Sequence, residues 1–371
     1  MEFIVNSAEP TTFATSTLVL GVYEGAGLSG QALAVDQATG GALSDVLKQG
    51  ELDGKAGQTQ LLYQVPNIAA QRVLLLGLGK QDALTIRQWR TICKGLANAV
   101  KSIVPTDIAL DLADMGSTHC DFAQQIRLLI EAVANNCYTF NQFKSEPSKS
   151  ATLKTMTLLL PADQTVAAEQ AIREGQAIIN GMALTRDLGN LPPNVCHPIY
   201  VAEQAQALAK QFPNLSVEVL DEQQMAELGM GSLLAVGQGS EQPPRLVVMK
   251  YNGTDAETKP YALVGKGITF DTGGISLKPG AGMDEMKYDM GGAASVLGTF
   301  RAVLELRLPI NLVGVLACAE NMPSGKATRP GDIVKTMSGK TVESLNTDAE
   351  GRLVLFDALT YTERFEPQAV I

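Results

Sequence analysis

Two stretches of this 371-residue sequence, residues 264–292 and residues 346–353, place carboxylates among glycines. Four of these carboxylates could form a site, namely Asp271, Asp289, Asp348 and Glu350. Burying a carboxylate is costly unless it is paired with a cation or bound to a metal ion. Carboxylate oxygens suit hard or borderline divalent cations. Four carboxylates exceed the need of one cation, so the pattern predicts a two-metal site with its ions roughly 3.5–4 Å apart.

The second stretch places Asp348, Glu350 and Arg352 at every other position. Side chains at this spacing point to the same side of an extended segment, so we expect the three to converge from one strand. Each carboxylate taken alone is better explained as a helix cap or as part of a solvated strand face. The joint occurrence of four carboxylates beside paired glycines favours the metal site over that explanation.

The first stretch is expected to bring its carboxylates to the edge of a sheet. Asp271 follows a strand predicted at residues 261–264 by one short turn, and Asp289 directly precedes a helix predicted to begin at Met290. Strand ends and helix starts are where open α/β sheets place their sites. The ligands are therefore expected to come from three segments of the chain.

The remaining composition excludes several other classes of site and partner. The chain has two histidines, His119 and His197, which excludes a three-histidine zinc site and an H-E-x-x-H helix. Its five cysteines show no paired spacing, and no secretory signal opens the chain, so a reducing cytoplasm is expected. The net charge of −10 disfavours nucleic acid as the main partner without excluding it. No apolar run reaches the roughly 20 residues of a membrane-spanning helix, so no membrane partner is expected.

The elements that must position these residues alternate between strand-like and helix-like patterns. This order predicts a two-domain α/β fold, with a smaller N-terminal domain and a larger C-terminal domain whose central mixed, largely parallel sheet is flanked by helices. The predicted boundaries are residues 1–162 for the first domain, 163–192 for a connecting helix and 193–371 for the second domain. Residues 368–371 resemble the opening of a strand, so we expect the chain to be truncated at its C-terminus.

At the level of motifs, the sequence resembles one family of enzymes. Residues 346–353 resemble the signature of the leucyl (cytosol) aminopeptidase family, and residues 264–279 and 283–292 resemble its other metal-site motifs. The similarity extends from about Gly181 to Ile371, and it includes a domain-junction segment with Arg186, Asn190, Pro192, Pro193 and Asn194. The first 160 residues fit the smaller N-terminal α/β domain of that family.

The resemblance implies a ligand set for two divalent ions. Asp271, Asp348 and Glu350 would hold one ion, with the main-chain carbonyl of Asp348 as a further ligand. Lys266, Asp271, Asp289 and Glu350 would hold the other, so that Asp271 and Glu350 bridge the pair. The ligand types accept Zn²⁺, Mn²⁺, Mg²⁺ or Co²⁺, and the native metal stays open.

The remaining implied roles concern the substrate and the proton. Lys278 would polarise the scissile carbonyl, and Arg352 would bind a bicarbonate ion that serves as general base. Met286 would line the pocket for the first side chain, and Asn346 would contact the substrate. The implied activity is that of a metal-dependent leucyl aminopeptidase, which hydrolyses the N-terminal residue from peptides through a metal-bridging hydroxide.

The resemblance also implies a homohexamer that acts in the cytoplasm on peptides with a free N-terminus. The alternative is a DNA-binding transcriptional or recombination accessory protein that keeps the peptidase fold, because some bacterial members of the family are said to have that second role. The negative net charge weighs against this alternative as the main role.

Overall fold

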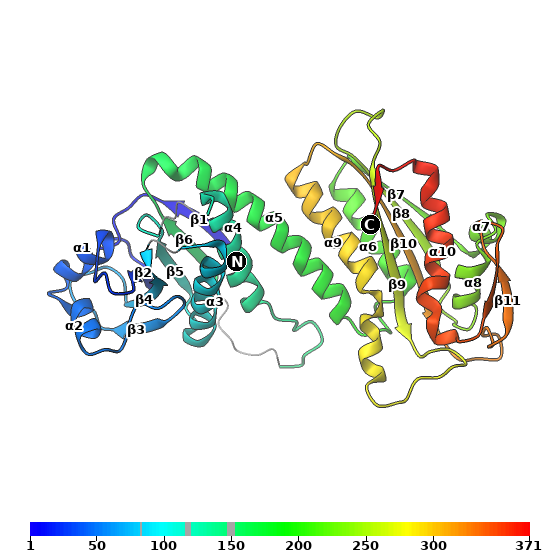
Figure 1. The fold of residues 1–371 in the computed structure, drawn as a ribbon, viewed down its shortest axis with the longest axis horizontal. Helices are drawn as coiled ribbons and strands as arrows, with labels where there is room; N and C mark the ends of the chain where they lie inside the picture. Colours follow the sequence, from blue (N-terminus) through cyan, green and yellow to red (C-terminus); the bar gives the residue numbers. More distant parts are fainter. Residues whose placement is uncertain (82–83, 116–119, 147–152) are drawn as a thin grey trace. The chain divides into compact units, whose positions relative to one another are not determined.

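The computed structural model describes residues 1–81, 84–115, 120–146 and 153–371, which form two compact units, Met1–Ile179 and Asn180–Ile371. Each unit contains its own sheet (Figure 1). Each also has its own apolar core. The predicted α/β fold, with mixed and mostly parallel sheets flanked by helices, is confirmed. Among the described residues, no helix combines the length with the hydropathy that crossing a membrane requires.

The sheet of the first unit has six strands in the order β1-β6-β5-β2-β4-β3. Neighbouring strands are parallel except β3, which pairs antiparallel with β4. The sequence patterns predict five strands, which match the other five observed strands to within a few residues, but they do not predict β3. The predicted ranges are residues 3–5, 17–23, 72–77, 108–112 and 153–160. The strands are β1 (Glu2–Asn6), β2 (Leu18–Tyr23), β3 (Thr59–Tyr63), β4 (Arg72–Gly79), β5 (Asp107–Asp111) and β6 (Thr155–Leu159).

Helices bury both faces of this sheet, which explains why its strands read as continuous apolar runs. Alternate residues of β2 and β4 pack against α3 and α4 on one face and against α1 and α2 on the other. The sequence predicts a helix that Thr85 caps and that runs to about Lys101. Thr85 caps α3 through a reciprocal exchange of hydrogen bonds with Gln88, which confirms that start. The helices are α1 (Gly30–Ala38), α2 (Ala42–Lys48), α3 (Ile86–Ile103) and α4 (Phe122–Cys137).

A single helix, α5 (Thr165–Asn190), follows a 3-10 turn at Ala162–Gln164. Within the predicted connecting segment 163–192, apolar residues recur at helical spacing over residues 163–188, so the existence and the length of the helix are close to the prediction. The helix continues through Gly189, where the sequence pattern predicts its end, and stops just before Pro192. The division between the two compact units falls inside α5, after Ile179.

The second unit is built on a five-stranded mixed sheet in the order β13-β9-β10-β8-β7. Strands β13, β9 and β10 are parallel, and β8 and β7 continue the sheet in antiparallel pairing. A separate hairpin pairs β11 (Asp332–Lys335) with β12 (Thr341–Ser344). The sheet strands are β7 (Leu215–Leu220), β8 (Arg245–Asn252), β9 (Tyr261–Asp271), β10 (Asn311–Asn321) and β13 (Ala369–Val370).

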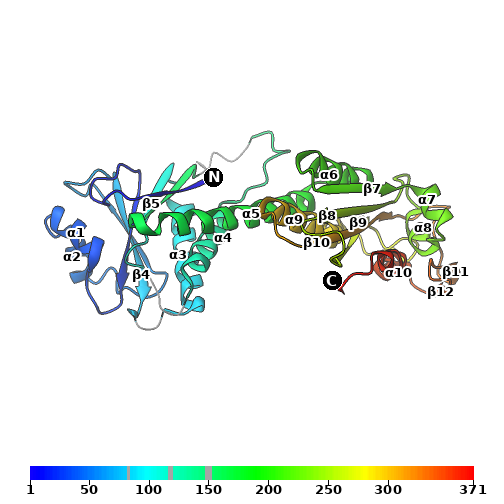
Figure 2. The same cartoon turned by 90° about the horizontal axis from the view of Figure 1, so that it is seen from above.

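Helices cover both faces of this second sheet (Figures 1 and 2). All 11 residues of β10 are buried, and alternate side chains such as Val313 and Val315 pack with residues of α8 and α10. The opposite face meets α9, where an added Cβ on Gly314 would lie 2.7 Å from Phe300. The helices are α6 (Pro198–Gln211), α7 (Glu222–Glu227), α8 (Gly231–Gly237), α9 (Gly291–Leu306) and α10 (Glu350–Thr362).

Strand β9 extends to Asp271, so the prediction of a short strand at residues 261–264 followed by a turn is wrong. Gly265, which interrupts the apolar strand pattern, lies where β9 packs closely against α9. A Cβ on Gly265 would lie 2.7 Å from the Cα of Ala293, and one on Gly292 would lie 2.8 Å from the nitrogen of Lys266. The start of α9 therefore rests directly on β9 beside Lys266, close to the end of the strand.

Candidate metal centre

Three of the four predicted carboxylates converge at the end of β9. One ligand oxygen from each of Asp271, Asp348 and Glu350 lies within 4.8 Å of the other two. Asp271 and Glu350 are buried, and Asp348 is half-buried. Carboxylates this close repel one another strongly unless cations lie among them. The arrangement is therefore that expected of a cation site. Two lysines lie among these carboxylates and balance part of their negative charge.

Asp348 and Glu350 reach the cluster from a helix start, so the prediction that they lie on an extended segment is wrong. Asp348 lies in the 3-10 turn η4 (Thr347–Ala349), and Glu350 is the first residue of α10. The apolar positions Leu353, Val354 and Ala358 recur at helical spacing and are buried, which favours the helix. At about 100° per residue, Arg352 points away from the side that carries Glu350.

Asp271 is held by main-chain and side-chain donors. Its Oδ1 accepts hydrogen bonds from the nitrogen of Gly273 at 2.9 Å and from Nδ2 of Asn321 at 2.8 Å. Its Oδ2 lies 2.9 Å from Nζ of Lys278, whose ammonium also contacts Oδ1 of Asp348. Burial works against the charged form of Lys278, but hydrogen bonds to Asp348 and Asp271 outweigh burial and raise the pKa of Lys278.

Lys266 brings the fourth carboxylate into the cluster. Its Nζ lies 2.8 Å from Oδ1 of Asp289 and 2.7 Å from Oε1 of Glu350. Asp289 lies in the 3-10 segment η3 (Met283–Met290) that leads into α9. Burial raises the pKa of Asp289 and of Glu350, and the positive charge of Lys266 offsets only part of that effect. For Lys266 itself, burial is outweighed by the two carboxylates, which raise the pKa of the ammonium group.

The donor set fits divalent metal ions. Oδ2 of Asp289 and Oε2 of Glu350 are buried without a hydrogen-bond partner. A buried carboxylate oxygen without a hydrogen-bond partner lowers the stability of a folded protein. Among the described side chains, none supplies a partner for these two oxygens. Four carboxylates face two ammonium groups, so the cluster carries excess negative charge even with both lysines protonated. Divalent cations would satisfy both the charge and the orphaned oxygens.

The other residues predicted for the site lie on the same segments. Arg352 is exposed in the first turn of α10, and Met286 is half-buried in η3. Asn346 caps η4, where its Oδ1 accepts a hydrogen bond from the nitrogen of Asp348 at 3.0 Å. Among the described residues, none of the three forms a hydrogen bond or an ion pair with a carboxylate of the cluster. Their predicted roles toward substrate or bicarbonate stay predictions.

Sequence reasoning missed Asn321, which donates to Asp271 from the end of β10. It also missed Thr347 and Ser276, which exchange main-chain and side-chain hydrogen bonds between the two stretches that carry the ligands. The one available signal for Asn321 is a polar residue that ends a long apolar strand. Which partner it meets depends on strand order, and the sequence patterns did not specify that order.

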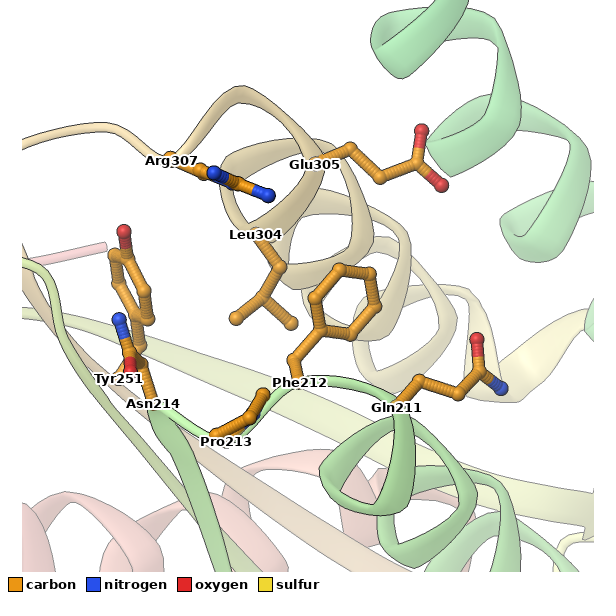
Figure 3. A pocket seen from close by; sticks show the side chains of 8 residues that line it. All are labelled: Gln211, Phe212, Pro213, Asn214, Tyr251, Leu304, Glu305 and Arg307. Atoms are coloured by element: carbon orange, nitrogen blue, oxygen red, sulfur yellow. The ribbon is translucent and has the colours of Figure 1, made fainter.

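A separate cavity of about 490 Å³ lies elsewhere in the second unit (Figure 3). It lies between the end of α6, the end of β8 and the last turn of α9, near Phe212, Tyr251 and Leu304. Helix α9 has 16 residues, so this cavity is about 24 Å from the end that follows Asp289. Its acid, Glu305, already pairs with Arg301 and accepts from Nδ2 of Asn180. The cavity does not belong to the metal centre.

Two family models match the chain. One describes the cytosol aminopeptidase family, N-terminal domain, and covers residues 19–147; the other describes the cytosol aminopeptidase family, catalytic domain, and covers residues 183–371. The cytosol aminopeptidase of Pseudomonas aeruginosa is 62% identical over 371 residues, which are 100% of this chain and 75% of that protein. The probable cytosol aminopeptidase of Azotobacter vinelandii is 59% identical over the same shares of both chains.

Two solved structures of related proteins are also similar to this chain. A variant of tomato leucine aminopeptidase superposes with a TM-score of 0.84 at 30% identity, over 100% of this chain and 72% of that chain. The bottromycin maturation enzyme BotP in complex with Mn superposes with a TM-score of 0.78 at 32% identity, over 95% of this chain and 70% of that chain. The similarity to both structures extends across both compact units.

Proposed function

This chain belongs to the cytosol aminopeptidase family, and from that premise we propose how its carboxylate cluster works. It is a leucyl aminopeptidase, a peptide hydrolase that depends on divalent metal ions. We infer that two such ions bind at the end of β9. The observation that carries this proposal is the convergence of three carboxylates, to which Lys266 joins a fourth, with two buried oxygens that have no hydrogen-bond partner.

The proposed ligands divide between two ions. Asp271, Asp348 and Glu350 would hold one ion, with the carbonyl of Asp348 adding a ligand. Lys266, Asp271, Asp289 and Glu350 would hold the other. The orphaned oxygens of Asp289 and Glu350 support this division, because each would gain a cation. When bound, the ions would supply Lewis acidity for activating water and for stabilising negative charge on the scissile carbonyl.

Lys266 can act as a ligand only as a neutral amine. Its present partners, Asp289 and Glu350, favour the ammonium form. Dications shared with the same carboxylates would reverse that balance, because nearby positive charge and burial both lower the pKa of a lysine. Lysine suits this position, since an arginine would keep its proton.

Lys278 would act on the substrate as a cation. It lies between Asp271 and Asp348, so it is already directed into the cluster. We propose that its ammonium donates to the carbonyl oxygen of the scissile peptide and stabilises the charge that develops there. An unperturbed lysine has a pKa of about 10.4, so the ammonium is the form available at neutral pH.

Proton transfer would use a bicarbonate ion held by Arg352. We propose that its guanidinium, which is always protonated and forked, binds a bicarbonate ion that serves as general base. The exposed position of Arg352 two residues after Glu350 leaves it accessible to such an ion. Met286 and Asn346 would contact the substrate from the segments η3 and η4 that also carry ligands.

The identity of the ions and the assembly are finer proposals. We propose Mn²⁺ or Zn²⁺ as the ions, with Mg²⁺ and Co²⁺ as alternatives, since the BotP structure reported above is a complex with Mn. The family resemblance supports a homohexamer, and the names of the relatives support a cytoplasmic location. The DNA-binding alternative is not proposed, because the Pseudomonas, Azotobacter and tomato relatives are all named aminopeptidases.

Removal of metal tests the centre directly. Dialysis against a chelator should abolish hydrolysis of leucine amide, and adding back Mn²⁺ or Zn²⁺ should restore it. Metal analysis of the active protein should find two ions per chain. A metal-free protein that still cleaves leucine amide at the parental rate would contradict the proposal.

A further inference from the structure

Asn321 lies between the two chain segments that carry most of the carboxylates. It is the last residue of β10, and 5% of its surface is exposed. Its Nδ2 donates to Oδ1 of Asp271 at 2.8 Å and to the carbonyl oxygen of Thr347 at 2.9 Å. Both partners are acceptors, so the amide must present its NH₂ group to them and both of its hydrogens are used.

A register shift between β9 and β10 creates this contact. Ala319 pairs with Ile268, but the next residue of β10 pairs with Phe270, so Thr269 is an extra residue on β9. Without this bulge, Asn321 would lie opposite Phe270. With it, Asn321 lies opposite Asp271. Bulges of this kind redirect side chains, and they are common next to functional sites.

The two donors on Oδ1 of Asp271 fix the orientation of that carboxylate. Asn321 and the nitrogen of Gly273 occupy Oδ1, which leaves Oδ2 directed toward Lys278 and the cluster. The carbonyl of Asn321 also accepts from the nitrogen of Thr272 at 3.0 Å and from its Oγ1 at 2.8 Å. The end of β9 and the turn after it are therefore held by one residue of the neighbouring strand.

The side-chain amide of Asn321 also binds the second ligand segment, residues 347–350. Thr347 opens η4, directly before Asp348, and its carbonyl is bonded to Asn321. Its Oγ1 donates to the carbonyl of Gly273 at 2.7 Å and accepts from the nitrogen of Ser276 at 2.8 Å. One buried side chain thus links the segment ending at Asp271 to the segment that carries Asp348 and Glu350.

We propose that Asn321 is a positioning residue that holds Asp271 and the Thr347–Glu350 segment in the geometry required to bind two divalent ions. The inference rests on the two-ion centre proposed above and extends it to a residue that is not itself a ligand. Hydrogen-bond partners of ligands typically change metal affinity by about 10–100-fold when they are removed. Asn321 supports two ligand segments at once, so its loss should affect both affinity and the spacing of the ions.

The opposite end of β10 provides a matched control. Asn311 is the first residue of the strand and is 6% exposed. Its Nδ2 also donates to two main-chain carbonyls, those of Asp255 and Thr258, each at 2.8 Å. The oxygen of the Asn311 amide also accepts a hydrogen bond from the nitrogen of Thr254 at 3.2 Å. The substitutions Asn321→Ala and Asn311→Ala therefore each remove a buried amide that donates two hydrogen bonds, at the two ends of one strand, and the control loses one accepted hydrogen bond more.

The experiment titrates Mn²⁺ into the intact, metal-free parent and both variants by calorimetry and records the electron paramagnetic resonance spectrum of each loaded protein. Unfolding in chelator measures the purely structural cost, which should be similar for the two variants. We expect Asn321→Ala to bind Mn²⁺ at least about tenfold more weakly and to lose the spectrum of coupled ions, while Asn311→Ala keeps both. Asn321→Ser, which retains a hydroxyl donor, provides the same comparison if the alanine variant does not fold.

The outcomes separate this inference from the proposal beneath it. A parent that binds two Mn²⁺ ions, with an Asn321 variant that matches it in affinity and coupling, overturns the positioning role and leaves the two-ion centre intact. Equal weakening by Asn311→Ala also overturns it, because the effect would then follow from lost stability alone. A parent that binds no Mn²⁺ overturns the two-ion centre and the positioning role together.

Discussion

Both units place carboxylates at the ends of parallel strands, but the two groups of side chains are neutralised in different ways. In the first unit, Asp111 ends β5, and Asp114 follows three residues later. In the second unit, Asp271 ends β9 and lies close to Asp348 and Glu350, and Lys266 joins Asp289 to this group. The position of a carboxylate at a strand end is thus shared by both units and cannot by itself define a metal site.

The two acids at the strand end of the first unit, Asp111 and Asp114, accept hydrogen bonds from the main chain, and Asp111 also holds a proton. Asp111 is 2% exposed and accepts one hydrogen bond, from the nitrogen of Ala113 at 3.3 Å. Burial, with a smaller effect from the charge of Asp114, raises the pKa of Asp111 to about 7. The Asp114 carboxylate accepts from the nitrogen of Gln31 at the start of α1. Within the described part of the chain, neither acid pairs with a lysine or arginine.

The acids of the second unit are balanced by cations. Lys266 and Lys278 each contact two carboxylates, and two buried oxygens still have no partner. The comparison shows what separates a metal centre from an acidic strand end. In the metal centre, carboxylates from separate segments converge and basic side chains lie among them. The centre also has fewer hydrogen-bond donors than its carboxylate oxygens could accept from.

The largest effect that tests this contrast is expected from Glu350→Gln. The substitution keeps the shape of the side chain and removes the charge that would bridge two ions. Loss of one preorganised electrostatic group costs enzymes about 10²–10³ in rate, so kcat/KM for leucine amide should fall by about 10³ or more. Metal analysis should show fewer than two ions per chain.

A matched substitution in the same unit should leave activity nearly unchanged. Glu305 is ion-paired like Glu350, but it is only half-buried and lies at the far end of α9 with Arg301 and Asn180 as partners. Glu305→Gln should therefore keep kcat/KM within a few-fold of the parent. If Glu350→Gln behaves like Glu305→Gln, the carboxylates at the end of β9 do not bind the catalytic ions.

A smaller loss is expected from Lys278→Met, which removes a cation but no metal ligand. Kcat should fall by about 10²-fold, because one stabilising charge on the developing oxyanion is lost. Two ions should still bind, which distinguishes this variant from Glu350→Gln. Lys340→Met, at an exposed position just before β12, is the control for removal of a lysine. Loss of metal from the Lys278 variant would show that Lys278 supports the ligands rather than the substrate.

Sequence patterns predict the alternation of strands and helices well, because the apolar periodicity is local. The helix capped by Thr85 and the buried run of β10 are of this kind. The sequence patterns mispredict an element where a residue packs against a segment that is far away in the sequence. Gly265 interrupts the strand pattern, yet it lies inside β9 because α9 approaches there, and a close approach between elements far apart in sequence leaves no local periodicity.

The candidate site shows the same division. The residue types of Asp271, Asp348 and Glu350 indicate cation binding from the sequence alone, and the structure brings them together. The spacing of Asp348 and Glu350 suggested a strand, but the buried apolar positions that follow them repeat at helical spacing. The contact of Asn321 with Asp271 depends on strand order and on a bulge, and neither can be derived from local patterns.

The smallest predicted effect concerns stability in the first unit. The unfolded state ionises Asp111 near its ordinary pKa of 3.8, whereas the folded state keeps the proton until about pH 7. Between these values the folded state binds more protons, so the free energy of unfolding falls as pH rises. The stability present below pH 4 is therefore lost by about pH 7, after which the difference stays constant.

Asp111→Asn should remove this pH dependence, because an amide has the shape of a protonated carboxyl and can still accept from Ala113. Each unit of pKa difference corresponds to about 1.4 kcal/mol, so the variant should gain up to about 4 kcal/mol over the parent at pH 8 and almost nothing at pH 4. Urea denaturation of both proteins at the two pH values measures the gain, and leucine amide hydrolysis should not change. If the Asp111→Asn variant is no more stable than the parent at pH 8, the Asp111 carboxylate is ionised in the folded protein and has a cation near it. The first unit would then hold a charged site of its own, and the contrast between the two strand ends would disappear.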